Sequence, residues 1–278
     1  MSATGVDETK AGTGGDTGAT AAVSGSSWLK PGLLWPIALS HAAVILIWWL
    51  AAEYAGIPRF ILPSPEETLA TLGSGSYAWV RNTAATVIEI YLGYAIAVCF
   101  GVALALGFYW FRWVSLMIFP LFVTLSMVPK VALGPLFVVW FGYGIDTNVF
   151  IAFTISFFPV LLTTWRGLRE VEPDMLDLAR ALKATRWQIF TKIQFPNALP
   201  YIFSGMKVGS ILAVAGAIVG EFIASESGLG YLMIQVQSVL DTAAMFMAVI
   251  LLTIVGVLLY LAIMLLERLL VVQDARIQ

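Results

Sequence analysis

The stretch Trp113–Ile145, WVSLMIFPLFVTLSMVPKVALGPLFVVWFGYGI, decides how the chain folds. Its 33 residues contain a single charge, Lys130, so a straight helix over them would be about 50 Å long. The hydrocarbon core of a bilayer is only about 30 Å thick. The stretch is therefore either two membrane spans or one broken span, and Pro129, Gly134 and Pro135 supply residues at which a helix breaks.

The rest of the chain has the composition of a membrane protein. Of its 278 residues, 60% are hydrophobic and 12% are charged, against about 45–50% and about 25% in a typical soluble domain. This balance excludes a water-soluble enzyme, and continuous apolar runs are unlike the alternating strands of an outer-membrane barrel. Five further runs are long enough to cross the bilayer as helices: Leu33–Ala52, Ile90–Phe111, Thr147–Trp165, Pro200–Gly220 (interrupted by Lys207) and Thr242–Leu266.

The positions of the basic residues distinguish six spans from seven, because short cytoplasmic loops collect Lys and Arg. Two spans within Trp113–Ile145 would place the most basic loop on the face opposite Lys30 and Arg112. With six spans and the N-terminus inside, only Arg59 and Arg81 lie outside. The inner flanks then hold Lys30, Arg112, Arg166, Arg169, Arg180, Lys183, Arg186, Lys192, Arg268 and Arg276. We therefore predict an all-α, multi-pass protein of the plasma (inner) membrane, with six transmembrane helices and both termini cytoplasmic.

Several kinds of chemistry are excluded by the residues that the sequence lacks. Cys99 is the only cysteine and His41 the only histidine, so no metal site or catalytic set is expected. A net charge of −2 gives no field that would attract nucleic acid. None of the six lysines precedes Ser or Thr, so the chain has no phosphate-binding loop for ATP. We expect no enzyme activity and no cofactor in this chain, and energy must come from a partner.

The N-terminal segment differs in composition from everything that follows it. Residues 1–27 contain six Gly, five Ala, five Thr and four Ser and no aromatic residue. Such a segment buries too little surface to offset the entropy of ordering it. We predict a disordered cytoplasmic tail over residues 1–30, and a transmembrane domain over residues 31–278.

Two segments between spans are predicted to face outward. Ser64-Pro65-Glu66-Glu67 has the residues of a capping box with proline at the first helical position, which predicts a short external helix through Leu72. After the fifth span, 225–230 is expected to turn into the partly apolar segment Tyr231–Leu240, which would lie in the membrane interface.

The long hydrophilic loop at residues 166–200 holds six of the fifteen basic residues. Leu176, Ala179 and Leu182 fall on one face of a predicted helix, and Thr185-x-x-Gln188 is a capping box that starts a second. Trp187, Phe190 and Ile193 form another apolar stripe, and Pro196 and Pro200 are expected to end the pattern. The loop would dock on a partner, pack on its own membrane domain or lie in the lipid interface.

Part of this loop resembles a known family. DLARALKATRWQIF at 177–190 and FPNALPYI at 195–202 closely resemble the EAA loop of permease subunits of ABC-type importers. The wider chain is similar to the nitrate/sulfonate/taurine branch of that family, over roughly 33–270. The segments that carry this likeness are ILPSP at 61–65, VPKVALGPL at 128–136, WFG at 140–142 and SGLGY at 227–231.

The resemblance implies a fold, partners and a role for the loop. It implies a type I (MetI-like) permease that pairs with a second copy of itself and receives solute from an external binding protein. Two cytoplasmic ATPase subunits would use ATP-Mg, and the loop would transmit their closure to the spans. The coupling residues would be Asp177, Ala179, Leu182, Lys183, Thr185, Trp187, Phe190 and Pro196. Asp177 replaces the usual glutamate and Lys183 the usual glycine; a positive φ at Lys183 would cost about 1 kcal/mol.

Polar residues inside spans are the candidates for a translocation pathway, because charge in the bilayer is costly. Lys130 follows Pro129 in the broken span and suits an anionic solute, or else it snorkels to the interface. Lys207 is expected to snorkel, and Glu89 and Glu221 to sit at span ends in the interface. The pathway candidates are Met127, Pro129, Lys130, Trp140 and Glu221.

The predicted function is therefore that of an ABC importer permease for a small, anionic solute. The alternative is a stand-alone, ion-coupled secondary transporter. Such a transporter would need carboxylates near mid-membrane to bind protons or sodium, whereas here the carboxylates are expected at span ends.

Overall fold

The computed structural model describes residues 31–271, and these residues form helices joined by short turns, without a strand. The predicted tail at residues 1–30 lies outside the described residues. The α-helices are α1 (Pro31–Tyr54), α2 (Pro65–Ala70), α3 (Trp79–Trp110), α4 (Arg112–Ser126), α5 (Gly134–Phe141), α6 (Ile145–Gly167), α7 (Pro173–Ala181), α8 (Arg186–Ile189), α9 (Phe195–Ala224), α10 (Leu229–Gln237) and α11 (Thr242–Leu270). Shorter helical turns are η2 (Thr71–Gly73), η3 (Gly75–Tyr77), η4 (Lys130–Leu133) and the π-helical η5 (Phe190–Gln194).

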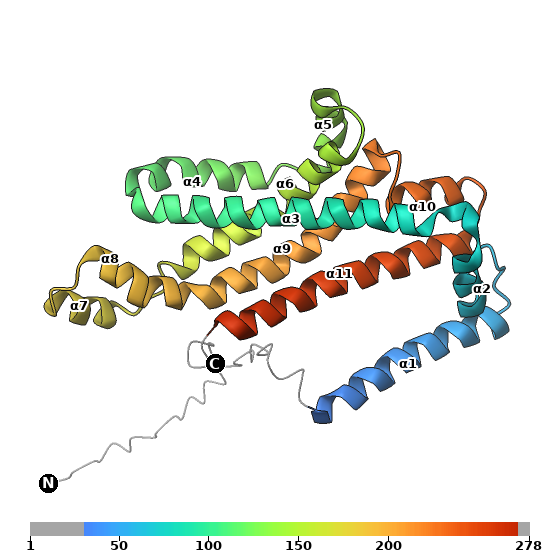
Figure 1. Ribbon diagram of the computed structural model, residues 1–278, viewed down its shortest axis with the longest axis horizontal. Helices are drawn as coiled ribbons and strands as arrows, with labels where there is room; N and C mark the ends of the chain where they lie inside the picture. The colour runs from blue at the N-terminus through green and yellow to red at the C-terminus, as the bar shows by residue number, and fades with distance from the viewer. Residues whose placement is uncertain (1–30, 272–278) are drawn as a thin grey trace, which may run out of the picture.

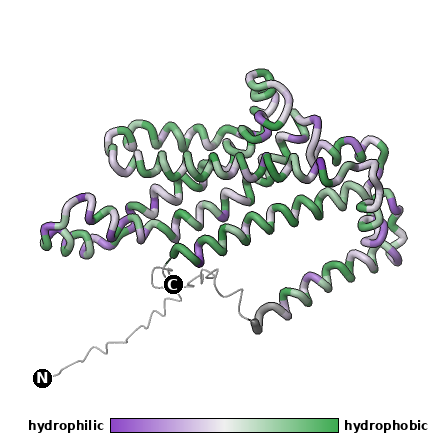
Figure 2. The backbone as a smooth tube through the Cα atoms, viewed as in Figure 1, coloured by the Kyte–Doolittle hydropathy of each residue, from purple (hydrophilic) through white to green (hydrophobic). Residues whose placement is uncertain are grey.

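Five helical segments of the described chain are long and apolar enough to cross a membrane, and a bent pair makes a sixth if its two arms count as one span. The five contain α1, α3, α6, α9 and α11, and the hydropathy colouring in Figure 2 shows that hydrophobic residues predominate along them. The bent pair is Trp113–Ser126 and Lys130–Phe141, which meet at 83°. The predicted all-α fold is confirmed, and the third span is broken at 127–129. Gly134 and Pro135 start α5 instead of breaking the helix.

Helix α6 packs between α3 and α9 at the centre of the bundle. Ala152 of α6 is fully buried. A Cβ atom built on Gly93 of α3 would lie 2.8 Å from the Ala152 Cβ, and one on Gly216 of α9 would lie 2.8 Å from the Ala152 Cα. Because these glycines lack a side chain, the backbones of the three helices approach closely at one level.

Figure 1 shows the short helices gathered at the two ends of the long ones. Helices α7 and α8 lie at one end, and α2 and α10 lie at the other. The start of α1 and the end of α11 both point away from α2 and α10, toward the end that carries α7 and α8. Both ends of the described chain thus point to the same side, as expected for a chain that crosses the membrane an even number of times.

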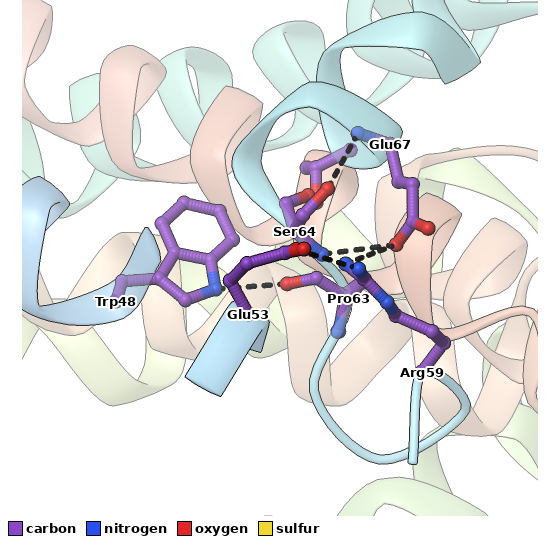
Figure 3. A network of polar contacts seen from close by, with 7 residues as sticks. Trp48, Glu53, Arg59, Pro63, Ser64 and Glu67 are labelled. Atoms are coloured by element: carbon purple, nitrogen blue, oxygen red, sulfur yellow. Dashed lines mark hydrogen bonds and ion pairs between the residues drawn. The ribbon is translucent and has the colours of Figure 1, made fainter. Parts of the chain in front are cut away.

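Helix α1 diverges from the bundle and is fixed to it by a polar network at its C-terminal end (Figure 3). The Trp48 indole N–H donates to the Pro63 carbonyl at 3.0 Å, and Arg59 pairs with Glu53 at 2.8 Å. Ser64 and Glu67 form the predicted capping box, with hydrogen bonds of 3.0 and 3.2 Å. The predicted short helix is thereby confirmed as α2 and η2, and its external position stays a prediction.

The segment expected in the membrane interface, 231–240, overlaps helix α10, which packs on the end of the bundle. Its Leu229, Leu232 and Val236 are buried, in one cluster with Trp79 of α3 and Met247 of α11. The apolar residues that predicted an interfacial position are thus partly used to hold α10 against the end of the long helices.

Candidate functional site

The loop between α6 and α9 folds into two short helices, as predicted. Helix α7 covers Pro173–Ala181 and α8 covers Arg186–Ile189. The capping box of α8 is formed in both directions: Gln188 N–H donates to Thr185 Oγ1 at 3.3 Å, and Thr185 N–H donates to Gln188 Oε1 at 2.8 Å. Asp177 pairs with Arg180 on the exposed side of α7, at 2.7 Å.

Lys183 has a left-handed backbone, with φ of 56°. The Lys183 N–H donates to the Arg180 carbonyl and the Ala184 N–H to the Ala179 carbonyl, at 2.9 and 3.0 Å. This pair of bonds is a Schellman motif, in which the position of Lys183 usually holds glycine. The strain expected from a lysine at this position is therefore present.

Replacing Lys183 by glycine is expected to stabilise the protein by about 1 kcal/mol, because glycine adopts positive φ without a Cβ clash. The measurement is thermal unfolding in detergent. Ala184→Gly is the matched control: Ala184 lies next to Lys183 and has no positive φ, so glycine there adds chain entropy without relieving strain. A lower melting temperature for Lys183→Gly than for the parent protein would contradict the assignment.

The apolar side of α7 that faces solvent differs from the one predicted. Met175, Leu178 and Leu182 are 50%, 62% and 75% exposed, and they lie on one face at i, i+3 and i+7. Ala179 is buried and Leu176 is half-buried. Of the predicted face only Leu182 is exposed, because α7 carries two apolar stripes and the sequence pattern does not tell which one turns outward.

Phe190 fixes the loop to the membrane helices. It is buried, and its ring centroid lies 5.3 Å from that of Tyr109 and 5.4 Å from that of Trp110, both at the end of α3. Trp187 is 62% exposed but stacks on Trp110, with centroids 6.1 Å apart. Phe195 at the start of α9 completes the cluster. These rings join α8, η5, α3 and α9 into one unit.

Pro196 and Pro200 do not end the helical pattern, contrary to expectation. Pro196 lies in the first turn of α9, directly after the π-helical η5, and Pro200 lies inside α9. Helix α9 follows η5 without a gap, so the loop at 166–200 and the fifth span are continuous.

A hollow of about 350 Å³ lies beside the exposed end of α7. Leu182, Ile189 and Ile193 supply apolar lining, and Lys183 and Lys192 supply positive charge. The hollow and the stripe Met175, Leu178 and Leu182 meet at Leu182. Together they form one continuous apolar surface, flanked by the basic residues Lys183 and Lys192.

The residues predicted around the break of the third span lie on an exposed surface of the described chain. Met127 and Trp140 are 77% and 61% exposed. Pro129 precedes η4 with an extended backbone, and Lys130 Nζ donates to the Ser126 carbonyl at 3.0 Å, across the break. Lys130 thus satisfies a carbonyl that the interrupted helix leaves open. Its part in a pathway stays a prediction.

Glu221 and Glu89 are buried among the helices, instead of lying exposed at the ends of their spans. Thr86 Oγ1 donates to Glu221 Oε1 at 2.5 Å, and Asn148 Nδ2 donates to Glu89 Oε1 at 2.8 Å. Asn82, Thr86 and Glu89 follow one another at helical spacing, which is the sequence signal that indicates a polar face on α3. Lys207 pairs with Glu267 of α11 at 2.6 Å, and its snorkelling to the membrane interface stays a prediction.

Comparison with known proteins gives one consistent result. The family described as "Binding-protein-dependent transport system inner membrane component" matches residues 97–272. The chain is 34% identical to the riboflavin transport system permease protein RibX of Chloroflexus aurantiacus, over 88% of this chain and 91% of that protein. It is 30% identical to the putative aliphatic sulfonates transport permease protein SsuC of Escherichia coli, over 81% of this chain and 87% of that protein.

A solved structure has a similar fold. The MetNI methionine ABC transporter, in inward-facing conformations, has a chain that matches with a TM-score of 0.51 and 19% identity. The match covers 74% of this chain and 99% of that one. At this identity the likeness concerns the fold alone, and the predicted MetI-like fold is confirmed.

Proposed function

The chain belongs to the family of binding-protein-dependent transport system inner membrane components, and we propose that it moves a small anionic solute across the membrane, as the relative named for aliphatic sulfonates suggests. It is a multi-pass inner-membrane protein, the permease subunit of an ABC importer, and not an enzyme. The observation that carries the proposal further is the exposed surface of α7 and α8, which is held to the two membrane helices α3 and α9 by the rings around Phe190.

We propose that this surface docks into a cytoplasmic ATPase subunit that uses ATP-Mg. The exposed stripe Met175, Leu178 and Leu182 provides apolar surface for an interface. Lys183 and Lys192 would complement acidic residues around the docking site of the partner. Asp177 and Thr185 hold the two short helices in shape through their own hydrogen bonds. Movement of the partner would pass through Trp187 and Phe190 to α3, and through η5 to α9.

The orientation and the second copy belong to the same proposal. If α7 and α8 face the cytoplasm, the start of α1 and the end of α11 point to the cytoplasmic side (Figure 1). The exposed apolar residues around the break, Met127, Val139 and Trp140, would face either lipid or a second copy of the chain. We propose the second copy, because a translocation pathway between two permeases would then run beside Pro129 and Lys130.

The proposed anionic substrate is supported by Lys130, a half-buried cation at the break of the third span. It is also supported by the relative named for aliphatic sulfonates. A second candidate is a heterocyclic solute, favoured by the relative named for riboflavin, which matches at slightly higher identity. These two classes differ in charge, so they are distinguishable by the effect of removing the Lys130 charge.

The test is reconstitution of the permease in proteoliposomes with its ATPase and its binding protein. We expect ATP-dependent uptake of an alkanesulfonate, no uptake when the ATPase is omitted, and at least a tenfold loss for Lys130→Met, with ATP hydrolysis retained. Uptake of riboflavin that is unaffected by Lys130→Met would favour the second candidate. Ion-driven transport by the permease alone would contradict the proposal, because it is the behaviour of a secondary transporter.

A further inference from the structure

A cluster of buried polar groups joins α3, α6, α9 and the turn before α10. Helix α3 contributes Asn82, Thr86 and Glu89, α6 contributes Asn148, and α9 contributes Glu221. All five side chains are more than nine-tenths buried. Because polar groups in such a position are costly unless they are paired, their hydrogen bonds can be accounted for atom by atom.

The turn Gly228–Gly230 is tied to the cluster by three backbone N–H groups. Gly228 N–H donates to Asn82 Oδ1 at 3.0 Å, and Leu229 N–H donates to Thr86 Oγ1 at 2.8 Å. Gly230 N–H donates to Glu221 Oε2. Gly228 has φ of 120° and its position faces the Glu221 carboxyl group, so only glycine fits there.

Glu221 has the contacts of an ionised carboxylate. Its Oε1 accepts a hydrogen bond from Thr86 and its Oε2 accepts one from Gly230. A carboxylate only accepts, and the Gly230 N–H can only donate. The Thr86 hydroxyl lies nearer to Glu221, at 2.5 Å, than to its other acceptor, the Asn82 carbonyl, at 3.2 Å, so both oxygens of Glu221 accept a hydrogen bond and neither needs a proton.

Glu89 has the contacts of a protonated carboxyl group. Its Oε1 accepts from Asn148, while its Oε2 has no hydrogen-bond partner although it is buried. Thr86, one helical turn before Glu89 on α3, bonds Glu221, and Asn148 bonds Glu89 while facing Gly220 beside Glu221, so the two carboxyl groups lie in one buried cluster. No Lys, Arg or His among the described residues forms an ion pair with either group. Two negative charges buried in one cluster would repel strongly, and a proton on Glu89 Oε2 removes that repulsion.

We propose that Glu89 and Glu221 hold one proton between them, with Glu89 as the donor, and that this proton-bearing pair fastens the Gly228–Gly230 turn to the three central spans. The pair is a proton-binding site at the α10 end of the bundle. Glu221 is then a positioning residue: it holds the turn through Gly230 only while Glu89 remains neutral. The other groups that face the pair, Asn82, Thr86 and Asn148, do not titrate.

The proposal predicts that replacement by glutamine affects transport differently at Glu89 and at Glu221. Glu89→Gln keeps a donor toward Glu221 and an acceptor toward Asn148, so transport by the complete complex should stay within about twofold of the parent. Glu221→Gln replaces one acceptor oxygen by an NH₂ group that faces a donor, and transport should fall at least about tenfold. Glu226→Gln, on the exposed part of the same loop, is the matched control and should have no effect.

Infrared spectroscopy of the purified complex tests the proton itself. The parent protein should have a carboxylic acid C=O band that shifts on transfer to D₂O; Glu89→Gln should abolish it, and Glu226→Gln should retain it. This measurement on folded parent protein remains decisive if Glu221→Gln fails to fold. Absence of the band from the parent, its survival in Glu89→Gln, or a reversed order of the two glutamine variants would each overturn the proposal. The proposal would also be overturned if the band were absent and sodium raised the melting temperature of the complex, because a bound cation would then neutralise the two glutamates.

Discussion

Leu182→Glu is expected to release the permease from its ATPase subunit. Leu182 is 75% exposed at the end of α7 and also lines the neighbouring hollow, so it lies at the centre of the proposed docking surface. An apolar anchor at the centre of an interface contributes about 2 kcal/mol or more, and a glutamate there would also be buried without a partner. We expect binding to weaken by roughly 30-fold or more, measured as loss of ATPase co-purification from mild detergent.

The same substitution elsewhere separates docking from general damage. Leu69 of α2 is 59% exposed at the opposite end of the bundle, and Leu69→Glu should leave ATPase co-purification intact. Because Leu182 is exposed, Leu182→Glu should also leave the melting temperature of the isolated permease within about 2 °C of the parent. If Leu182→Glu retained the ATPase, the α7 stripe would not be the docking surface.

Ala179 is a poor position for the same experiment, although the sequence pattern places it on the apolar face of the first loop helix. In the structure it is buried, and its carbonyl accepts the hydrogen bond that closes the Schellman motif. A large side chain there would disturb the loop as well as any interface. Periodicity identifies the helix and its two apolar stripes, but burial depends on what the rest of the chain brings to one of them.

The spans were predictable because each depends on local properties. Uncharged runs of sufficient length, the basic loop and the two capping boxes all act through neighbours in sequence, and the structure has the corresponding helices. Pro129 was likewise a local signal, and the break lies there. Pro196 was ambiguous, because proline both follows helices and begins them.

The glutamate pair was not predictable by the same means. Glu89 and Glu221 are 132 residues apart, and each falls at the end of an apolar run, where an interfacial position is the ordinary expectation. Their burial follows from the close packing of α3, α6 and α9 around Ala152, and from the turn that covers them. Only the polar spacing of Asn82, Thr86 and Glu89 on one helix indicated a buried face.

Phe190→Ala is expected to uncouple ATP hydrolysis from transport. The substitution removes a buried ring that contacts Tyr109 and Trp110 of α3 and Phe195 of α9. Such a loss costs about 3–5 kcal/mol in a well-packed core. The exposed stripe of α7 does not include Phe190, so the ATPase should still bind. The solute transported per ATP hydrolysed should fall at least tenfold in proteoliposomes, because the loop no longer moves α3 and α9 with it.

Phe222→Ala distinguishes this effect from the mere loss of a ring. Phe222 lies on α9 as well but is 44% exposed, so its removal leaves a smaller void and no broken link to the loop. Its ratio of transport to hydrolysis should match that of the parent. If Phe190→Ala lowered hydrolysis and transport in equal proportion, the ring cluster would support the fold of the loop without transmitting its motion. If Phe190→Ala changed neither the ratio of solute transported to ATP hydrolysed nor the melting temperature, the loop would be held to α3 by other contacts.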